Sequence, residues 1–210
     1  FEHYSEQYIF SPLGMKDTFA RVPEQRIADC LNYNYEHRVA DGQYFINTHA
    51  VPGLPHDPKA RLLISGGRGL CGHAGIFSTA QNMVQFAQGL LAGSLLSRRM
   101  LFEIGRNRTG RAGGGRYRQY LGYLCFSKSS IQRFSEVPAW MGESAFGQAG
   151  YTGNHLAIDP EMGVFDLLLG NRCHMRVSAV EPGEQAEGLG LSLEGAGSVT
   201  WPDGRQVKSS

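Results

Sequence analysis

The chain has 210 residues, of which 41% are hydrophobic and 19% charged, and its formal net charge at pH 7 is +1. This size and composition are typical of one globular domain or two small ones. The near-zero charge argues against nucleic acid as a partner, and no apolar run approaches the roughly 20 residues that a transmembrane helix needs. No signal peptide is visible in the sequence. Because the chain begins at Phe1 without a methionine, a preceding segment could hold one, so the sequence leaves the compartment open.

The first quarter of the chain is predicted to hold one helix and a long irregular segment. Residues 1–10 are predicted to be helical, and the prolyl and glycyl residues at Pro12 and Gly14 stop that helix. Residues 20–60 mix aromatic and polar side chains with prolines and a glycine, which predicts irregular structure. A loop that long in a compact domain usually forms a functional wall or crosses the surface.

Two capped helices are predicted next. The clearest runs from about Ala80 to Ala92, with an apolar stripe at helical spacing and a capping-box pattern at Ser78 and Gln81. Gly93 is predicted to end it. A second, shorter helix is predicted between a cap at Ser97 and a glycine at Gly105.

Strand patterns dominate the rest of the chain. The arginines between residues 106 and 118 are interrupted by glycines, which indicates a solvated loop rather than a nucleic-acid site. Residues 117–127 are then predicted to form a strand. Residues 155–159 and 164–170 are predicted to pair as a hairpin, with 164–169 apolar enough for a central strand. Residues 200–207 resemble a further hairpin, and no internal repeat is visible.

Five segments, in order, resemble the serine β-lactamase-like family, which includes class C β-lactamases, DD-peptidases and related esterases. They are Ile9–Thr18 (IFSPLGMKDT), Gly53–Ala60 (GLPHDPKA), Gly72–Ala80 (GHAGIFSTA), Phe146–Asn154 (FGQAGYTGN) and Gly170–Arg172 (GNR). The resemblance implies an α+β fold, with helices packed on an antiparallel sheet. It covers residues 1–175, expected to be the C-terminal portion of such a domain, and leaves 176–210 as a glycine-rich extension with a possible hairpin.

The chemistry that the resemblance implies needs three elements. A Ser-x-x-Lys pair supplies the nucleophile and its activating amine, a Tyr-x-Asn element assists proton transfer, and a Lys-Thr-Gly or His-Thr-Gly strand lines the pocket. Only the third has a counterpart here. In the family the nucleophile precedes the segment that Ile9–Thr18 resembles, so we expect it and the Tyr-x-Asn element before Phe1. The chain alone is therefore predicted to be inactive and to hold no catalytic residue.

The third element departs from the family pattern, because Gln148-Ala149-Gly150 stands where the basic residue, threonine and glycine are usual. Glutamine carries no charge and does not titrate, and alanine removes the hydroxyl. Three interpretations stand. Activity has been lost; the substrate is neutral and Gln148 donates a hydrogen bond to it; or the register places Thr152-Gly153 at the pocket instead.

The predicted substrate-binding residues are Gln148, Ala149, Gly150, Tyr151 and His73. For His73 a structural role is the alternative, with its ring bonded to loop carbonyls in a turn. The full protein is predicted to hydrolyse an ester, amide, peptidoglycan-type peptide or β-lactam through an acyl-enzyme. The alternative is a non-catalytic binding or scaffold protein on the same fold, which the neutral Gln148-Ala149 pair favours.

The remaining polar residues predict no metal site and no cofactor. The four cysteines Cys30, Cys71, Cys125 and Cys173 match no zinc or redox spacing and are predicted to be structural thiols. Neighbouring residues on a strand point to opposite faces, so Cys173 and His174 are not expected to share a site. Asp57 precedes Pro58 and is predicted to begin a turn rather than to pair with His56.

Overall fold

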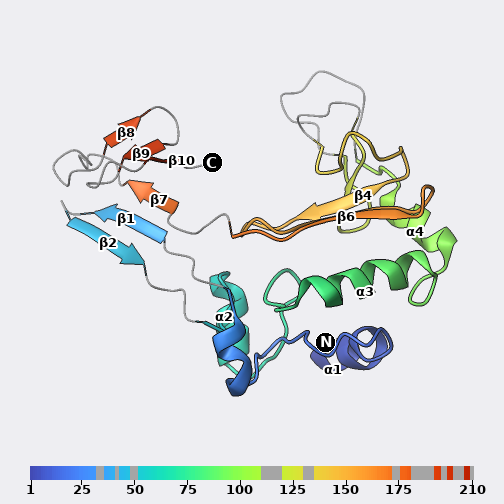
Figure 1. Ribbon diagram of the computed structural model, residues 1–210, viewed down its shortest axis with the longest axis horizontal. Helices are drawn as coiled ribbons and strands as arrows, with labels where there is room; N and C mark the ends of the chain where they lie inside the picture. Colours follow the sequence, from blue (N-terminus) through green and yellow to red (C-terminus); the bar gives the residue numbers. More distant parts are fainter. Residues whose placement is uncertain are drawn as a thin grey trace. The chain divides into compact units, whose positions relative to one another are not determined.

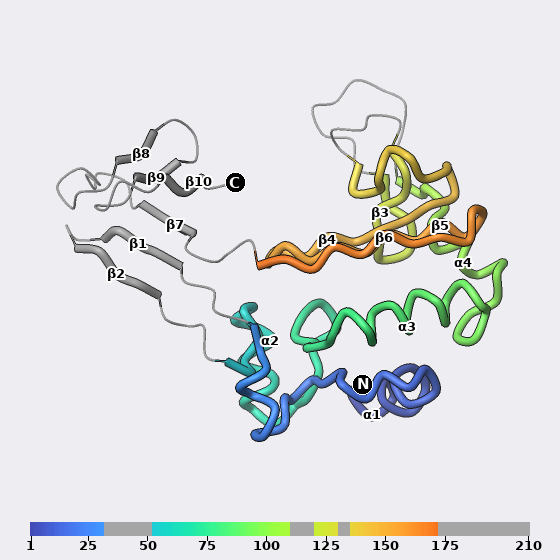
Figure 2. The backbone as a smooth tube through the Cα atoms, viewed as in Figure 1, coloured from blue at the N-terminus to red at the C-terminus, as the bar shows by residue number. Residues whose placement is uncertain are grey.

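A computed structural model describes residues 1–31, 52–109, 120–129 and 135–171 in full. It also describes six further strands by their extent and pairing alone, at 36–40, 43–47, 176–180, 192–194, 198–200 and 206–208. Figure 2 draws in colour the parts of the backbone with described side chains. In these parts no helix is long and apolar enough to cross a membrane.

The chain divides into two compact units. The first contains residues 1–20 and 76–170, and the second contains 21–75 and 171–210. Each unit is described below by itself. The predicted boundary at residue 175 stays a prediction.

Two helical layers lie on one side of the sheet in the first unit (Figure 1). The chain opens with α1 (Glu2–Ser5) and the π-helical turn η1 (Glu6–Phe10), which confirms the predicted N-terminal helix. Helix α3 (Ala80–Leu91) lies between this segment and the sheet. Buried Asn82 of α3 ties this helix to the segment that follows η1, because its Oδ1 accepts hydrogen bonds from Asp17 N (2.8 Å) and from the Thr18 hydroxyl (3.0 Å).

The helix boundaries agree with the sequence except at one cap. Gly93 follows α3 with a φ of +77°, the left-handed conformation that ends helices. Ser97 caps α4 (Arg98–Gly105) by accepting from Met100 N. The capping box predicted at Ser78 is wrong, since the side chain that caps α3 is Thr79, which accepts from Asn82 N. Ser78 Oγ instead hydrogen-bonds to the hydroxyl of Thr18 at 2.8 Å.

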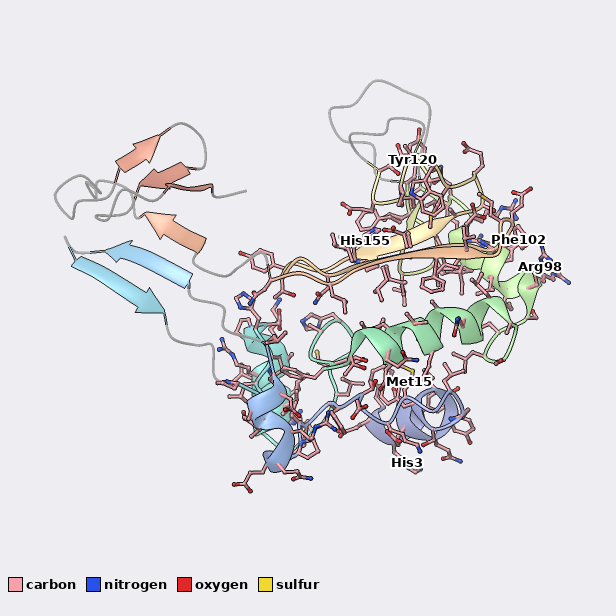
Figure 3. All side chains as sticks on the ribbon, in the orientation of Figure 1. His3, Met15, Arg98, Phe102, Tyr120 and His155 are labelled. Carbon is pink, nitrogen blue, oxygen red and sulfur yellow. The ribbon has the colours of Figure 1, made fainter. Side chains whose placement is uncertain are left out.

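The sheet of the first unit is antiparallel, with the order β3-β4-β5-β6. Its strands are β3 (Phe126–Ser127), β4 (Phe146–Ala149), β5 (His155–Asp159) and β6 (Val164–Leu168). The core between sheet and helices contains Leu90, Leu101, Cys125, Phe146 and Ile158. Figure 3 shows the side chains that fill this layer and the β5 residue His155. The predicted class, helices packed on an antiparallel sheet, is confirmed.

Two strand predictions need correction. Within 117–127, residues 117–119 lie outside the described part, and only Phe126–Ser127 is a strand. Gly122 N instead donates to Cys125 O (3.0 Å) in a tight loop where Leu124 has a φ of +56°. The hairpin of β5 and β6 is confirmed, but β6 lies at the edge of the described sheet rather than at its centre. Its side chains are accordingly half-buried or exposed.

In its described part, the second unit contains two short helices and two small sheets. Helix η2 (Glu24–Asp29) is 3-10 and α2 (Pro58–Ser65) is α-helical. One sheet has the strand order β2-β1-β7, with β2 at Gln43–Asn47, β1 at Glu36–Ala40 and β7 at Arg176–Val180. The other sheet has the strand order β10-β9-β8, with β10 at Gln206–Lys208, β9 at Ser198–Thr200 and β8 at Ser192–Glu194. The irregular segment predicted over residues 20–60 is therefore wrong in large part. The antiparallel pairing of β9 with β10 agrees with the second predicted hairpin.

Candidate active site

Four of the five predicted substrate-binding residues lie together at the C-terminal end of β4. Gln148 and Ala149 are the last two strand residues, and Gly150 and Tyr151 begin the turn that leads to β5. Gln148, Gly150 and Tyr151 are exposed and Ala149 is half-buried. Thr152 and Gly153, which the alternative register would bring to the pocket, lie in that turn.

The glycine that packing requires is Gly147, one residue before this end. A Cβ atom there would lie 3.0 Å from Leu156 O and 3.2 Å from Glu136 O, both of them backbone atoms. At Gly150 the nearest atom, Asn154 O, would be 3.4 Å from such a Cβ, an ordinary contact. Packing among the described residues therefore requires a glycine at position 147, whereas at position 150 the same packing has room for a Cβ atom.

Within the described part of the chain, one edge of β4 has no partner strand beside the predicted site, and we call it the open edge. Among the described residues, β3 pairs only with Phe146 and Gly147 and does not reach Ala149. The carbonyl of Ala145 points to the β3 side, where it accepts from Lys128 N at 3.1 Å. Backbone groups of alternate residues point to the same edge of a strand, so those of Ala149 are directed to the open side. The Gln148 side-chain amide donates to Ala149 O at 3.3 Å.

The turn that follows β4 is closed by its own hydrogen bonds. Gly150 N donates to Asn154 O (2.6 Å), and Gly153 N donates to Gly150 O (3.0 Å). Asn154 Oδ1 also accepts from Gly170 N (3.1 Å), which joins the turn to the end of the β6 segment. The Tyr151 side chain, 52% exposed, projects from a turn that is held at both ends.

His155 is a titratable residue beside this site that the sequence analysis did not single out. It pairs with Ala149 in the β4–β5 register, so both lie on the same face of the sheet. Its Nε2–H donates to the carbonyl of Glu136, and Nδ1 lies 3.7 Å from a carboxylate oxygen of Asp166. With both nitrogens engaged, His155 fastens the loop before β4 to the sheet. The pairing of 149 with 155 could have been found from the hairpin turn alone.

Asp159 organises the opposite end of the same sheet. Its carboxylate is fully buried and accepts from the backbone N–H groups of Gly142 (2.7 Å), Glu161 (2.9 Å) and Met162 (3.0 Å). Burial acts to raise the pKa of this carboxyl, but the three backbone donors outweigh it, so the pKa lies below its ordinary value of 3.8. The ionised carboxylate thus fixes both the β5–β6 turn and the loop that leads to β4.

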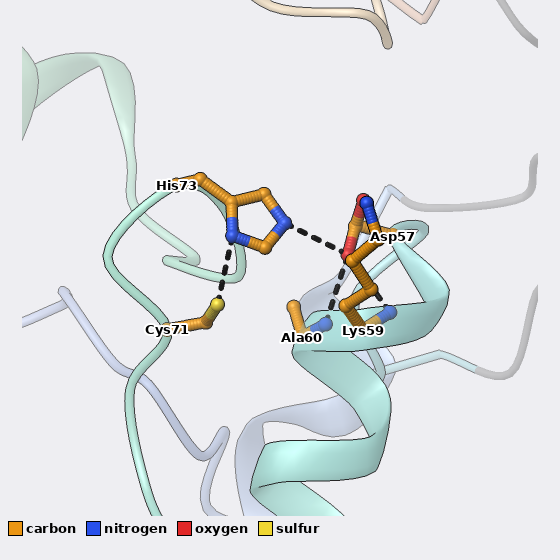
Figure 4. Close-up of polar contacts among 5 residues, drawn as sticks. All are labelled: Asp57, Lys59, Ala60, Cys71 and His73. Atoms are coloured by element: carbon orange, nitrogen blue, oxygen red, sulfur yellow. Dashed lines mark hydrogen bonds and ion pairs between the residues drawn. The ribbon is translucent and has the colours of Figure 1, made fainter. Parts of the chain in front are cut away.

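His73, the fifth predicted residue, belongs to the second unit, so its place beside Gln148 stays a prediction. The structural alternative expected the ring to bond to loop carbonyls, but its two nitrogens contact side chains instead. Nε2 lies 3.0 Å from Asp57 Oδ1 and Nδ1 lies 2.9 Å from Cys71 Sγ (Figure 4). Asp57 begins a helix rather than an isolated turn, because it is the N-cap of α2.

A shallow pocket of about 550 Å³ lies elsewhere in the first unit, and none of the predicted residues lines it. Charged side chains on its walls are Glu103, Arg106, Lys128, Glu143 and Glu161. Arg106 and Arg108, from the basic run, form ion pairs with Glu103 at 3.5 and 2.7 Å. Within the described residues no three histidine, cysteine or acidic side chains are grouped to hold a metal ion.

Comparison with known proteins assigns the chain to a family. A family model described as Beta-lactamase matches residues 1–188. The chain belongs to the Beta-lactamase family. This is a family of serine hydrolases, and the match confirms the resemblance carried by the five sequence segments. A putative D-alanyl-D-alanine carboxypeptidase of Salmonella gallinarum is 30% identical over 202 residues, and one of Salmonella typhi is 29% identical. The aligned part covers 90% of the chain but only 44% of each relative.

Two solved structures share the fold of this chain. A penicillin-binding protein homologue from Caulobacter crescentus superposes with a TM-score of 0.54 at 20% identity, covering 81% of this chain and 46% of that one. A mutant of simvastatin synthase from Aspergillus terreus gives 0.53 at 16% identity, covering 86% and 46%. This β-lactamase-family chain therefore matches less than half of the length of each of these proteins.

Proposed function

We propose that this chain forms one wall of the active site in a serine hydrolase that works through an acyl-enzyme. The nucleophilic serine and its lysine are proposed to come from a Ser-x-x-Lys element outside residues 1–210, as is the Tyr-x-Asn element. The observation that carries the proposal is the open edge of β4, where the family's pocket-lining strand motif ends in exposed Gln148 and Gly150.

The open edge favours an extended substrate with a peptide-like backbone. A peptide can add to an exposed sheet edge as a further strand, with main-chain hydrogen bonds supplying the affinity. Ala149 directs its backbone groups to that edge, and the Gln148 amide that now contacts Ala149 O can turn to a substrate carbonyl. The Salmonella relatives are named as putative D-alanyl-D-alanine carboxypeptidases, which supports a peptide-like substrate.

Gln148 sets the polarity of this substrate. A lysine or histidine in its place could pair with a substrate carboxylate, whereas glutamine offers only a neutral donor and acceptor. The proposed substrate is therefore an uncharged ester, amide or peptide segment at this position. The second candidate, a binding protein without catalysis, draws on the same observation, because neither Gln148 nor Ala149 supplies a charge or a hydroxyl.

Covalent labelling of the full-length protein separates the two candidates. A fluorescent penicillin and a fluorophosphonate are incubated with the folded protein, and the labelled peptide is identified by mass spectrometry. The enzyme proposal expects one adduct on a serine that is followed, three residues later, by lysine. Full-length protein that melts cooperatively yet takes neither label would count decisively for the binding protein.

A further inference from the structure

The strongest unassigned feature is a chain of three side chains in the second unit. Cys71, His73 and Asp57 are joined in that order by contacts of 2.9 and 3.0 Å, as Figure 4 shows. A thiol, an imidazole and a carboxylate in this order are the parts of an activated nucleophile: one group to attack, one to take its proton and one to orient the base.

The carboxylate fixes which ring nitrogen of His73 carries the proton. Asp57 Oδ1 already accepts from the backbone N–H groups of Lys59 and Ala60, both at 2.9 Å, so its position is set by helix α2. The N–H of Ala60 is the main reason that the pKa of Asp57 is lowered, which keeps the group ionised at neutral pH. An ionised acceptor at Nε2 requires a proton there. Nδ1 is then left with its lone pair toward the Cys71 thiol.

The turn that carries Cys71 and His73 is packed firmly against the same helix. Gly75 has a φ of +103°, and a Cβ atom there would lie 3.2 Å from Ala60 Cβ and 3.4 Å from Pro55. A reagent can nevertheless approach. The His73 side chain is 50% exposed, and a Cβ atom at Gly72 would meet nothing within 4 Å. Cys71 itself retains 9% of its surface.

The other described cysteines lack this arrangement. Cys125 donates to the carbonyl of Ile104, and burial raises its pKa to about 11. Cys30 contacts the carbonyl of Arg26, and its pKa is also raised, first by burial. A carbonyl cannot take the thiol proton, whereas an imidazole can.

We propose that Cys71 is a nucleophilic thiol, activated by His73 and Asp57, that forms mixed disulfides with low-molecular-weight disulfides. The Cys71 proton passes to His73 Nδ1, and the thiolate attacks one sulfur of the small disulfide. A new S–S bond forms to Cys71 while the original S–S bond breaks. The departing thiolate takes the proton from the imidazolium and leaves as a thiol, so Cys71 is oxidised and the reagent is reduced. This reactivity does not depend on the proposed serine site.

A single metal ion does not explain the cluster equally well. The thiol and the carboxylate approach opposite nitrogens of the imidazole ring, so one ion cannot replace both contacts. The arrangement instead matches proton transfer along the ring, from the thiol on one side to a histidine held by the carboxylate on the other.

The test measures thiol reactivity at each cysteine in the full-length protein at pH 7. The protein is treated with a limiting amount of iodoacetamide, and alkylation of each cysteine is followed by peptide mass spectrometry. Rates in urea-unfolded protein supply the intrinsic value for each position. We expect folded Cys71 to react about tenfold faster than folded Cys30, because the Cys71 thiol faces an imidazole that can take its proton, whereas the Cys30 thiol faces a backbone carbonyl.

Variants assign the effect to the two partners. His73→Gln is expected to lower the Cys71 rate to that of Cys30 or below, and Asp57→Asn, which still caps α2, to lower it by a smaller factor. The matched control His56→Gln keeps all three groups and should leave the rate unchanged. Dithiodipyridine should then place a mixed disulfide on Cys71 first. The proposal is overturned if wild-type Cys71 reacts no faster than Cys30, if His73→Gln reacts as fast as wild type, or if no mixed disulfide forms at Cys71.

Discussion

Replacing Asp159 should cost more stability than replacing any exposed carboxylate of the same sheet. In Asp159→Asn the amide oxygen can take the place of Oδ1 and keep the N–H groups of Glu161 and Met162. The amide nitrogen then faces the N–H of Gly142, donor against donor, where Oδ2 now accepts at 2.7 Å. Loss of one buried hydrogen bond to a charged group costs about 1.5–3 kcal/mol.

The alanine variant is the more severe change. Asp159→Ala leaves three backbone donors without their acceptor in a fully buried position. We therefore expect the free energy of unfolding to fall by about 4 kcal/mol, as is usual when a buried hydrogen-bond network is broken. Asp166→Asn is the matched control on the adjacent strand. Its carboxylate is 41% exposed and lies 3.7 Å from His155, so its loss should change stability by less than about 0.5 kcal/mol.

The contribution of Asp159 should also depend on pH with a definite sign. Its pKa is lower in the folded chain than the ordinary value of 3.8, so its stabilisation is fully present above about pH 4 and is lost as the pH falls through the folded pKa. Urea unfolding of the full-length protein, followed by circular dichroism at several pH values, measures this. The difference between wild type and Asp159→Asn should shrink below pH 4. Equal free energies of unfolding for Asp159→Asn and Asp166→Asn at pH 7 would refute the reasoning.

Three further predictions concern β4 and its support. Gly147→Ala should lower the free energy of unfolding by about 1–3 kcal/mol, because the new methyl group meets fixed backbone; Gly72→Ala, in open space, should be neutral in the same urea titration. Asn82→Ala should lower the stability by about 2 kcal/mol, as measured by thermal melt. A loss equal to that of exposed Gln81→Ala would contradict the role of Asn82 in holding α3 to the segment that follows η1. Gln148→Ala should slow acylation by fluorescent penicillin about tenfold, because that is the rate change that the loss of one hydrogen bond produces. The control, Met162→Ala, changes an exposed residue at the other end of the sheet and should leave the rate unchanged.

Much of the fold was predictable because it is encoded by neighbours along the chain. The stripe of α3, the cap at Ser97 and the β5–β6 hairpin each depend on residues within a few positions of one another. The family segments located β4 and its exposed end for the same reason. Where the prediction failed, as for the strand expected over 117–127, aromatic composition suggested a strand while backbone bonds near Gly122 made a loop.

By itself, then, the sequence determined the family, the principal helices and the position of the strand end at which we propose that substrate binds. The tertiary structure alone decided which distant groups meet. Nothing in the spacing of Cys71, His73 and Asp57 indicates their contact, because it requires α2 and the glycine turn to pack together. The same holds for Asp159, whose donors come from two segments. It also holds for the open edge of β4, because among the described residues β3 pairs only as far as Gly147. Local periodicity specifies elements, whereas packing specifies the chemistry between them.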